Sequence, residues 1–176
     1  MNKSVTISKL DAVKRQLETA IHLYFLSRDP VAIHTLASAA HKIITDLNKH
    51  RGGSPTFNEK MLSHHIKPGC EKEVYRLLHH AENFFKHADK DPAGIIEFNP
   101  DASEVILWES CIKYTEFTGE QTPAMQTMNG WFQLSHPDMF NFEDWRKERI
   151  ASSAPFAQSL GKETFYKEFM KLKLSE

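Results

Sequence analysis

The chain has 176 residues, of which 40% are hydrophobic and 26% are charged, and its formal net charge is -1 with histidine neutral. This composition is typical of a folded chain that buries a sizeable core, and it excludes a disordered body. The charge gives no general basic surface for nucleic acid, so any RNA contact has to be local, although protonation of the ten histidines would make the chain more positive.

Two features of the sequence indicate the compartment. Cys70 and Cys111 are the only cysteines, and they form neither a disulfide framework nor a thiolate zinc motif. The first twenty residues lack the apolar stretch of a secretory signal, and no apolar run reaches the roughly 18 residues of a membrane span. We therefore expect a cytoplasmic protein without a membrane partner.

The first half of the chain predicts two consecutive helices. Apolar residues at three- and four-residue steps predict an amphipathic helix over residues 8–27. A second helix is predicted from Pro30, with Asp29 as its N-cap, to the sequence RGG at residues 51–53. One face of this second helix is apolar and another is polar. The polar stripe consists of His34, Ser38, His41 and Thr45.

A third helix is predicted over residues 70–88, and its apolar face includes Phe84 and Phe85. The sequence DPAGIIEFNPD that follows predicts an ordered loop, because its Asp-Pro and Asn-Pro steps exclude a continuing helix.

Further helices are predicted over residues 103–117, from Thr122 to about residue 135, and over 162–174. No period-2 pattern of a strand appears. The sequence therefore predicts one all-α domain over residues 1–176, a helical bundle of about five to six helices with a less regular C-terminal half.

The third predicted helix carries the first candidate site. Positions four, seven and eleven apart lie on one face of a helix, which aligns Arg76, His80, Asn83 and His87 away from the apolar face. A neutral imidazole can accept a proton, an arginine can hold a phosphate and an asparagine can orient either group. The stripe is a candidate ribonuclease-like site, and its alternative is an ordinary polar helix flank.

A metal site is a further alternative. His34 and His41 have the same spacing as His80 and His87, so facing helices could gather the four imidazoles. The repeated Glu-x-x-His pattern of di-metal bundles is absent, and so are the phosphate loop, nucleophile elbow and HExxH motifs. We therefore assign no metal ligand and expect no cofactor.

The pairing of DPVAIHTLASAAHKIITDLNKHRG with YRLLHHAENFFKHADKDP resembles the two central helices of HEPN domains, a superfamily of helical nucleotide-binding and ribonuclease domains. The resemblance covers about residues 8–92. It implies that Asn83 is the polar residue after the motif arginine and that His87 is the motif histidine, the general base of metal-independent RNA cleavage. Glu82 stands at the position of the arginine, and a carboxylate cannot hold a phosphate as a guanidinium does.

The resemblance also implies a homodimer, because HEPN domains commonly pair through these helices. We expect a HEPN-like protein that binds a nucleotide or RNA, with lost or altered ribonuclease activity. His87 and Asn83 are the candidate catalytic residues. The candidate binding residues are Arg76, His80, His34 and His41. The alternatives are a non-enzymatic interaction or regulatory protein and a histidine-rich metal-binding bundle.

Overall fold

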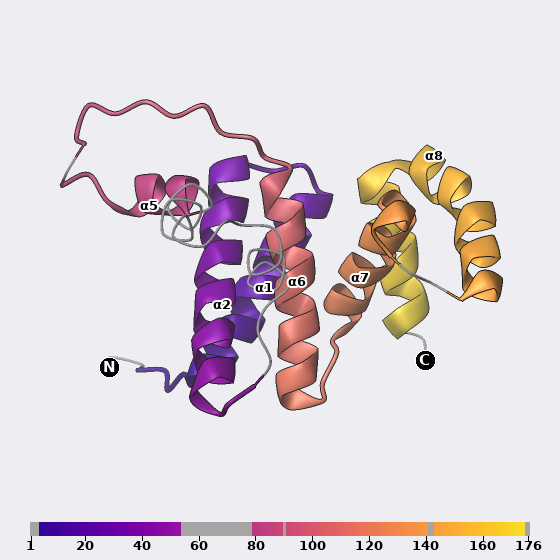
Figure 1. Ribbon diagram of the computed structural model, residues 1–176, viewed down its shortest axis with the longest axis horizontal. Helices are drawn as coiled ribbons and strands as arrows, with labels where there is room; N and C mark the ends of the chain where they lie inside the picture. The colour runs from indigo at the N-terminus through magenta and orange to yellow at the C-terminus, as the bar shows by residue number, and fades with distance from the viewer. Residues whose placement is uncertain (1–3, 54–78, 90, 141–142, 175–176) are drawn as a thin grey trace, which may run out of the picture.

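The computed structural model describes residues 4–53, 79–89, 91–140 and 143–174, and in these ranges it contains six α-helices and no strand. The predicted all-α bundle is therefore confirmed. The helices, which Figure 1 labels, are α1 (Lys9–Phe25), α2 (Pro30–His50), α5 (His80–Lys86), α6 (Ala102–Thr118), α7 (Pro123–Ser135) and α8 (Asp144–Leu174), with a single 3-10 turn at Pro137–Met139.

Helix α1 lies within two residues of its predicted bounds, and α2 begins and ends at the capping signals that the sequence predicts. The Ser8 hydroxyl accepts a hydrogen bond from the backbone N–H of Asp11, whose carboxylate in turn accepts from the N–H of Ser8, so that the two form a capping box. Asp29 caps α2 by accepting from the N–H of Ala32 at 2.8 Å. Gly52, with φ of 74°, supplies the left-handed residue just past the end of α2.

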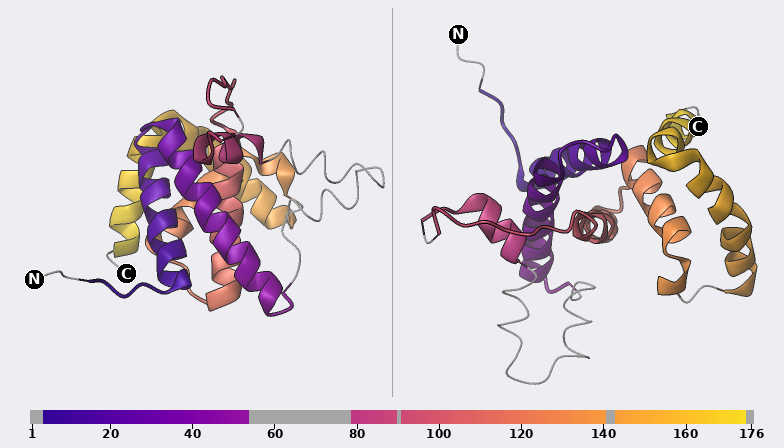
Figure 2. Two further views of the ribbon diagram at one scale, coloured as in Figure 1. Left: turned by 90° about the vertical axis from the view of Figure 1, so that its left-hand side faces the viewer. Right: turned by 90° about the horizontal axis from the view of Figure 1, so that it is seen from above.

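The core forms where α1, α2 and α6 pack side by side, with α7 and α8 packing beyond them and α5 on the outer side of α2 (Figures 1 and 2). Helices α1 and α2 contribute the apolar faces that their periodicity predicts. The largest fully buried apolar side chains are Phe25, Phe132, Leu17, Ile21, Ile44, Leu107, Met125, Met128 and Val13. Within the described ranges, no helix combines the length and the apolar character that crossing a bilayer requires.

Helices α2 and α6 run parallel, with their C-terminal ends joined by one side chain. Arg51, just past α2, donates hydrogen bonds to the carbonyl oxygens of Phe117 at 2.8 Å and Glu116 at 3.2 Å. Its guanidinium also lies 3.6 Å from the centroid of the Phe117 ring. These contacts satisfy carbonyl groups at the end of α6 that have no partner within the helix.

The C-terminal helix is longer than predicted. The sequence predicted a helix only over residues 162–174, whereas α8 begins at Asp144 and continues across a kink at Gly161, where φ is 73°. Pro155 and a serine-rich stretch obscured the helical pattern of its first part, because both residue types favour other conformations. The C-terminal half is therefore more helical in detail than the sequence indicated.

Candidate functional site

Helix α5 carries the candidate residues His80 and Asn83, and both side chains are exposed. The helix ends at Lys86, so His87 is its C-cap and adopts extended backbone with φ of -133° and ψ of 127°. The predicted continuation of the helix to residue 88 is wrong at this end. Pro92 disfavours helical backbone at Asp91, the residue directly before it, and so bars a helix through that position without itself setting the end at Lys86. His87 is also exposed, but it does not continue a helical stripe. Arg76 lies outside the described residues.

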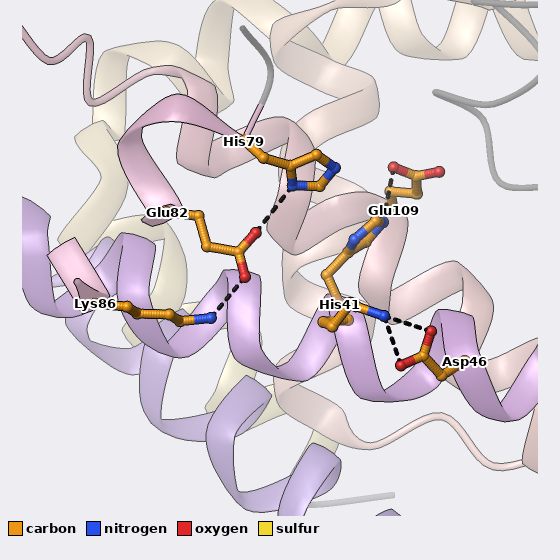
Figure 3. A network of polar contacts seen from close by, with 7 residues as sticks. His41, Asp46, His79, Glu82, Lys86 and Glu109 are labelled. Carbon is orange, nitrogen blue, oxygen red and sulfur yellow. Dashed lines mark hydrogen bonds and ion pairs between the residues drawn. The ribbon is translucent and has the colours of Figure 1, made fainter. Parts of the chain in front are cut away.

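Glu82, the residue that the resemblance in sequence would align with a motif arginine, is held between two neighbours (Figure 3). Its carboxylate lies 2.9 Å from Nδ1 of His79 and accepts a hydrogen bond from Nζ of Lys86 at 2.6 Å. The His79 contact is the main cause that lowers the pKa of Glu82 to about 2, with Lys86 adding to it against the opposing effect of burial. A fixed negative charge therefore stands on α5, where the resemblance expects a positive one.

The polar stripe of α2 lies inside the bundle. His34, only 2% exposed, places Nδ1 3.1 Å from the hydroxyl of Ser103 on α6. Its ring makes edge contacts with Phe85 and Phe98, at centroid distances of 5.8 and 4.9 Å. Burial lowers the pKa of His34, which keeps the imidazole neutral.

Three buried atoms of this stripe have no hydrogen-bond partner among the residues that the structure describes. They are Nε2 of His34 and the hydroxyl oxygens of Ser38 and Thr45. Buried polar groups without partners are uncommon in folded proteins and carry a desolvation cost. The seam between α2 and α6 is therefore more polar than a helix interface requires for stability alone.

His41, one turn beyond Ser38, is paired with a buried acid. Its Nε2 lies 3.2 Å from Oε2 of Glu109 on α6, and the Glu109 side chain is only 2% exposed (Figure 3). The contact to a carboxylate assigns the proton to Nε2 and leaves Nδ1 as an acceptor. Such a pair orients the imidazole with Nδ1 as its acceptor, and His79, beside Glu82 at the start of α5, is oriented by a carboxylate in the same way.

No sequence pattern identified Glu109 as a candidate residue. Helix α6 also buries Glu104, whose carboxylate accepts a hydrogen bond from the indole N–H of Trp131 at 3.0 Å, and Lys113. Charged residues are rarely buried without partners, so a charged residue in a sequence predicts a position that faces solvent. Only the position of α6 between its neighbours identifies these charges as interior.

The candidate histidines do not gather into one site. His34 and His41 face α6 from inside the bundle, whereas His80 and His87 are exposed on and after α5. Among the described residues, no three histidine, cysteine or acidic side chains are placed to hold a metal ion together. The arrangement thus separates an exposed surface of hydrogen-bonding groups from an interior His-Glu pair.

Comparisons of the chain with models of protein families, with curated proteins and with solved structures found no match.

Proposed function

We propose that this chain is a nucleotide- or RNA-binding helical protein that forms a homodimer and binds through the surface at α5 without cleaving RNA there. The observation that carries the proposal is the exposure of His80, Asn83 and His87 around one short helix. Neutral imidazole and amide groups offer both donors and acceptors to base edges, ribose hydroxyls and phosphate oxygens.

The state of Glu82 supports binding over catalysis at this surface. Its low pKa keeps it negative at neutral pH, and its two oxygens are occupied by His79 and Lys86. A carboxylate here repels the phosphate that the motif arginine would stabilise in the transition state. His87 also stands beyond the end of the helix, so the family's helical arrangement of base and arginine is not available to it.

RNA binding can be measured by fluorescence anisotropy with a labelled single-stranded oligonucleotide, at two salt concentrations because phosphate contacts are salt-dependent. The test variant replaces His80, Asn83 and His87 together with alanine. The matched control is His50→Ala, which removes an exposed histidine at the end of α2. We expect the triple variant to bind RNA at least about fivefold more weakly, because it loses one or two modest hydrogen bonds. The control should bind RNA as the wild type does.

Cleavage is measured separately by incubating the same RNA with EDTA present and resolving the products. We expect no cleavage by the wild type or by His87→Ala. If the wild type cleaves the RNA and His87→Ala does not, the proposed loss of catalysis is refuted. If the wild type and the triple variant bind RNA equally well, the proposed binding through the α5 surface is refuted. Sedimentation velocity tests the homodimer.

A second candidate function is a non-enzymatic protein-interaction role. Trp145 and Phe156 on α8 favour it, because they are 56% and 68% exposed and large apolar side chains are costly to leave in water. This alternative expects Phe156→Ser to change self-association in sedimentation experiments while the chain binds no RNA. The anisotropy and sedimentation measurements together separate the two functions.

A further inference from the structure

A cavity of about 210 Å³ opens at the end of the bundle opposite Arg51. The turn between α1 and α2, the start of α6 and the bend of α8 meet there. Its lining includes Tyr24, Ser27, Arg28, Asp101 and Lys162. None of these residues belongs to the α5 surface, so an inference from the cavity stands independently of the function proposed above.

Two cations line this cavity. Within the described ranges, Arg28 and Lys162 form no ion pair with an acid, whereas Lys167, one turn further along α8, binds Glu163 at 2.6 Å. Nζ of Lys162 instead lies 4.1 Å from the centroid of the Tyr24 ring. Asp101 is the one acid in the lining, so the lining itself carries an excess of one positive charge, while the charges of Glu163 and Glu104 lie within electrostatic reach of Arg28 and Tyr24.

The parallel packing of α2 and α6 adds to this positive potential. Both helices start at the cavity, since Pro30 and Asp101 both line it, and the N-terminal end of a helix carries a partial positive charge, which at α2 is partly offset by the capping carboxylate of Asp29. Asp101, the N-cap of α6, makes no side-chain capping hydrogen bond. Its carboxylate is therefore not committed to the helix.

A buried hydroxyl and a strained turn also belong to the cavity. Tyr24 is 6% exposed, and within the described part of the chain its hydroxyl has no hydrogen-bond partner of acceptable geometry. Burial and then the charge of Glu104 raise the pKa of Tyr24, so the phenol remains a donor. Ser27 has φ of 49°, the only positive φ of a non-glycine residue in the described ranges, and it fixes the turn that carries Arg28. Left-handed backbone costs a non-glycine residue about 1–2 kcal/mol and persists where the surroundings impose it.

We propose that this cavity binds a small oxyanion, the phosphate or carboxylate group of an organic molecule, between Arg28 and Lys162. The volume lies below the roughly 300–1,000 Å³ of pockets that enclose a drug-sized ligand. It suits one anionic group, with the rest of the ligand in solvent. An arginine and a lysine together supply the planar pair of donors and the compact charge that oxyanions commonly meet.

Isothermal titration calorimetry on the full chain tests the site with inorganic phosphate and with acetate as probes. The variants are Arg28→Gln and Lys162→Gln, and the control is Arg15→Gln, which removes the same charge from an exposed position on α1. We expect the wild type to bind at least one probe saturably. Each cavity variant should bind that probe about tenfold or more weakly, because it loses charge-assisted hydrogen bonds. The control should bind it with unchanged affinity. Lys162→Arg, which keeps the charge, should retain binding.

Asp101→Asn tests whether the ligand carries a negative charge. Removing this carboxylate should strengthen binding of the anion by about threefold to tenfold, because one unit of opposing charge disappears from the lining. Weaker binding of the anion in Asp101→Asn would overturn the proposal, because it would show that the carboxylate supports the bound ligand and does not oppose it. Absence of saturable binding by the folded wild type, or an equal loss in Arg15→Gln, would also overturn it, and circular dichroism establishes that each variant is folded.

Discussion

Replacing His34 with phenylalanine tests how the buried polar seam responds to pH. The substitution keeps an aromatic ring beside Phe85 and Phe98 but removes the contact with the Ser103 hydroxyl and the buried Nε2 that has no partner. Losing the Ser103 hydrogen bond costs about 1 kcal/mol, and removing a buried unsatisfied nitrogen offsets a similar amount. At pH 7 we therefore expect the free energy of unfolding to change by less than about 1 kcal/mol.

The effect grows as the pH falls. Burial lowers the pKa of His34 in the folded state below its ordinary value of 6.5. Above pH 6.5 the His34 imidazole is neutral in both the folded and the unfolded chain, so its contribution to the free energy of unfolding is fully present. Below it, the unfolded chain binds a proton that the folded chain does not, so stability is lost until the folded pKa is reached. Through His34, the wild type therefore loses stability below pH 6.5 with a slope of at most about 1.4 kcal/mol per pH unit, and the variant does not.

Urea denaturation of wild type and His34→Phe between pH 8 and pH 5 measures this difference. Subtracting one profile from the other removes the contributions of the other histidines, which both proteins share. His50→Gln, which alters an exposed histidine on the same helix, should give a profile parallel to that of the wild type. Parallel profiles for His34→Phe and the wild type would refute the burial of a neutral imidazole between α2 and α6.

Two further substitutions test contacts that hold the bundle together. Arg51→Ala should lower the free energy of unfolding by about 1–3 kcal/mol in urea denaturation, because it removes two hydrogen bonds to α6 carbonyl groups and the contact over the Phe117 ring; no loss would show that the ends of α2 and α6 are held by other contacts. Glu82→Gln should destabilise the chain by roughly 1 kcal/mol at pH 7, after allowance for solvent screening of a partly exposed group. Because its folded pKa is about 2, this contribution is present above the ordinary value of 4.5 and disappears as the pH falls towards 2, so an effect independent of pH would contradict the charged contacts with His79 and Lys86.

The sequence alone determined the helical class and the positions of several helix ends. Ser8 and Asp29 act on backbone groups within three residues, and Gly52 supplies its left-handed conformation without a distant partner. These signals are local, so they survive any tertiary arrangement. Apolar periodicity in α1 and α2 likewise selected the faces that became the core.

Periodicity was least informative where a helix is covered on several sides. Helix α6 buries Glu104 and Glu109 together with apolar residues, so no single face marks its interior. The end of α5 was also missed, because the sequence continues a helical pattern through His87 while the backbone turns extended there. Hydrophobic pattern measures average burial along a helix and does not identify the partner of a particular polar side chain.

The chemistry of the candidate sites was decided by tertiary structure. His34 meets Ser103 across 69 positions of sequence and His41 meets Glu109 across 68. The sequence placed both histidines on one stripe of α2, but their burial and their partners depend on α6 packing against that stripe. Local hydrogen bonding and side-chain spacing fix which helices form, whereas the burial of a charge is set by the packing of whole helices, which bring together residues that the sequence keeps far apart.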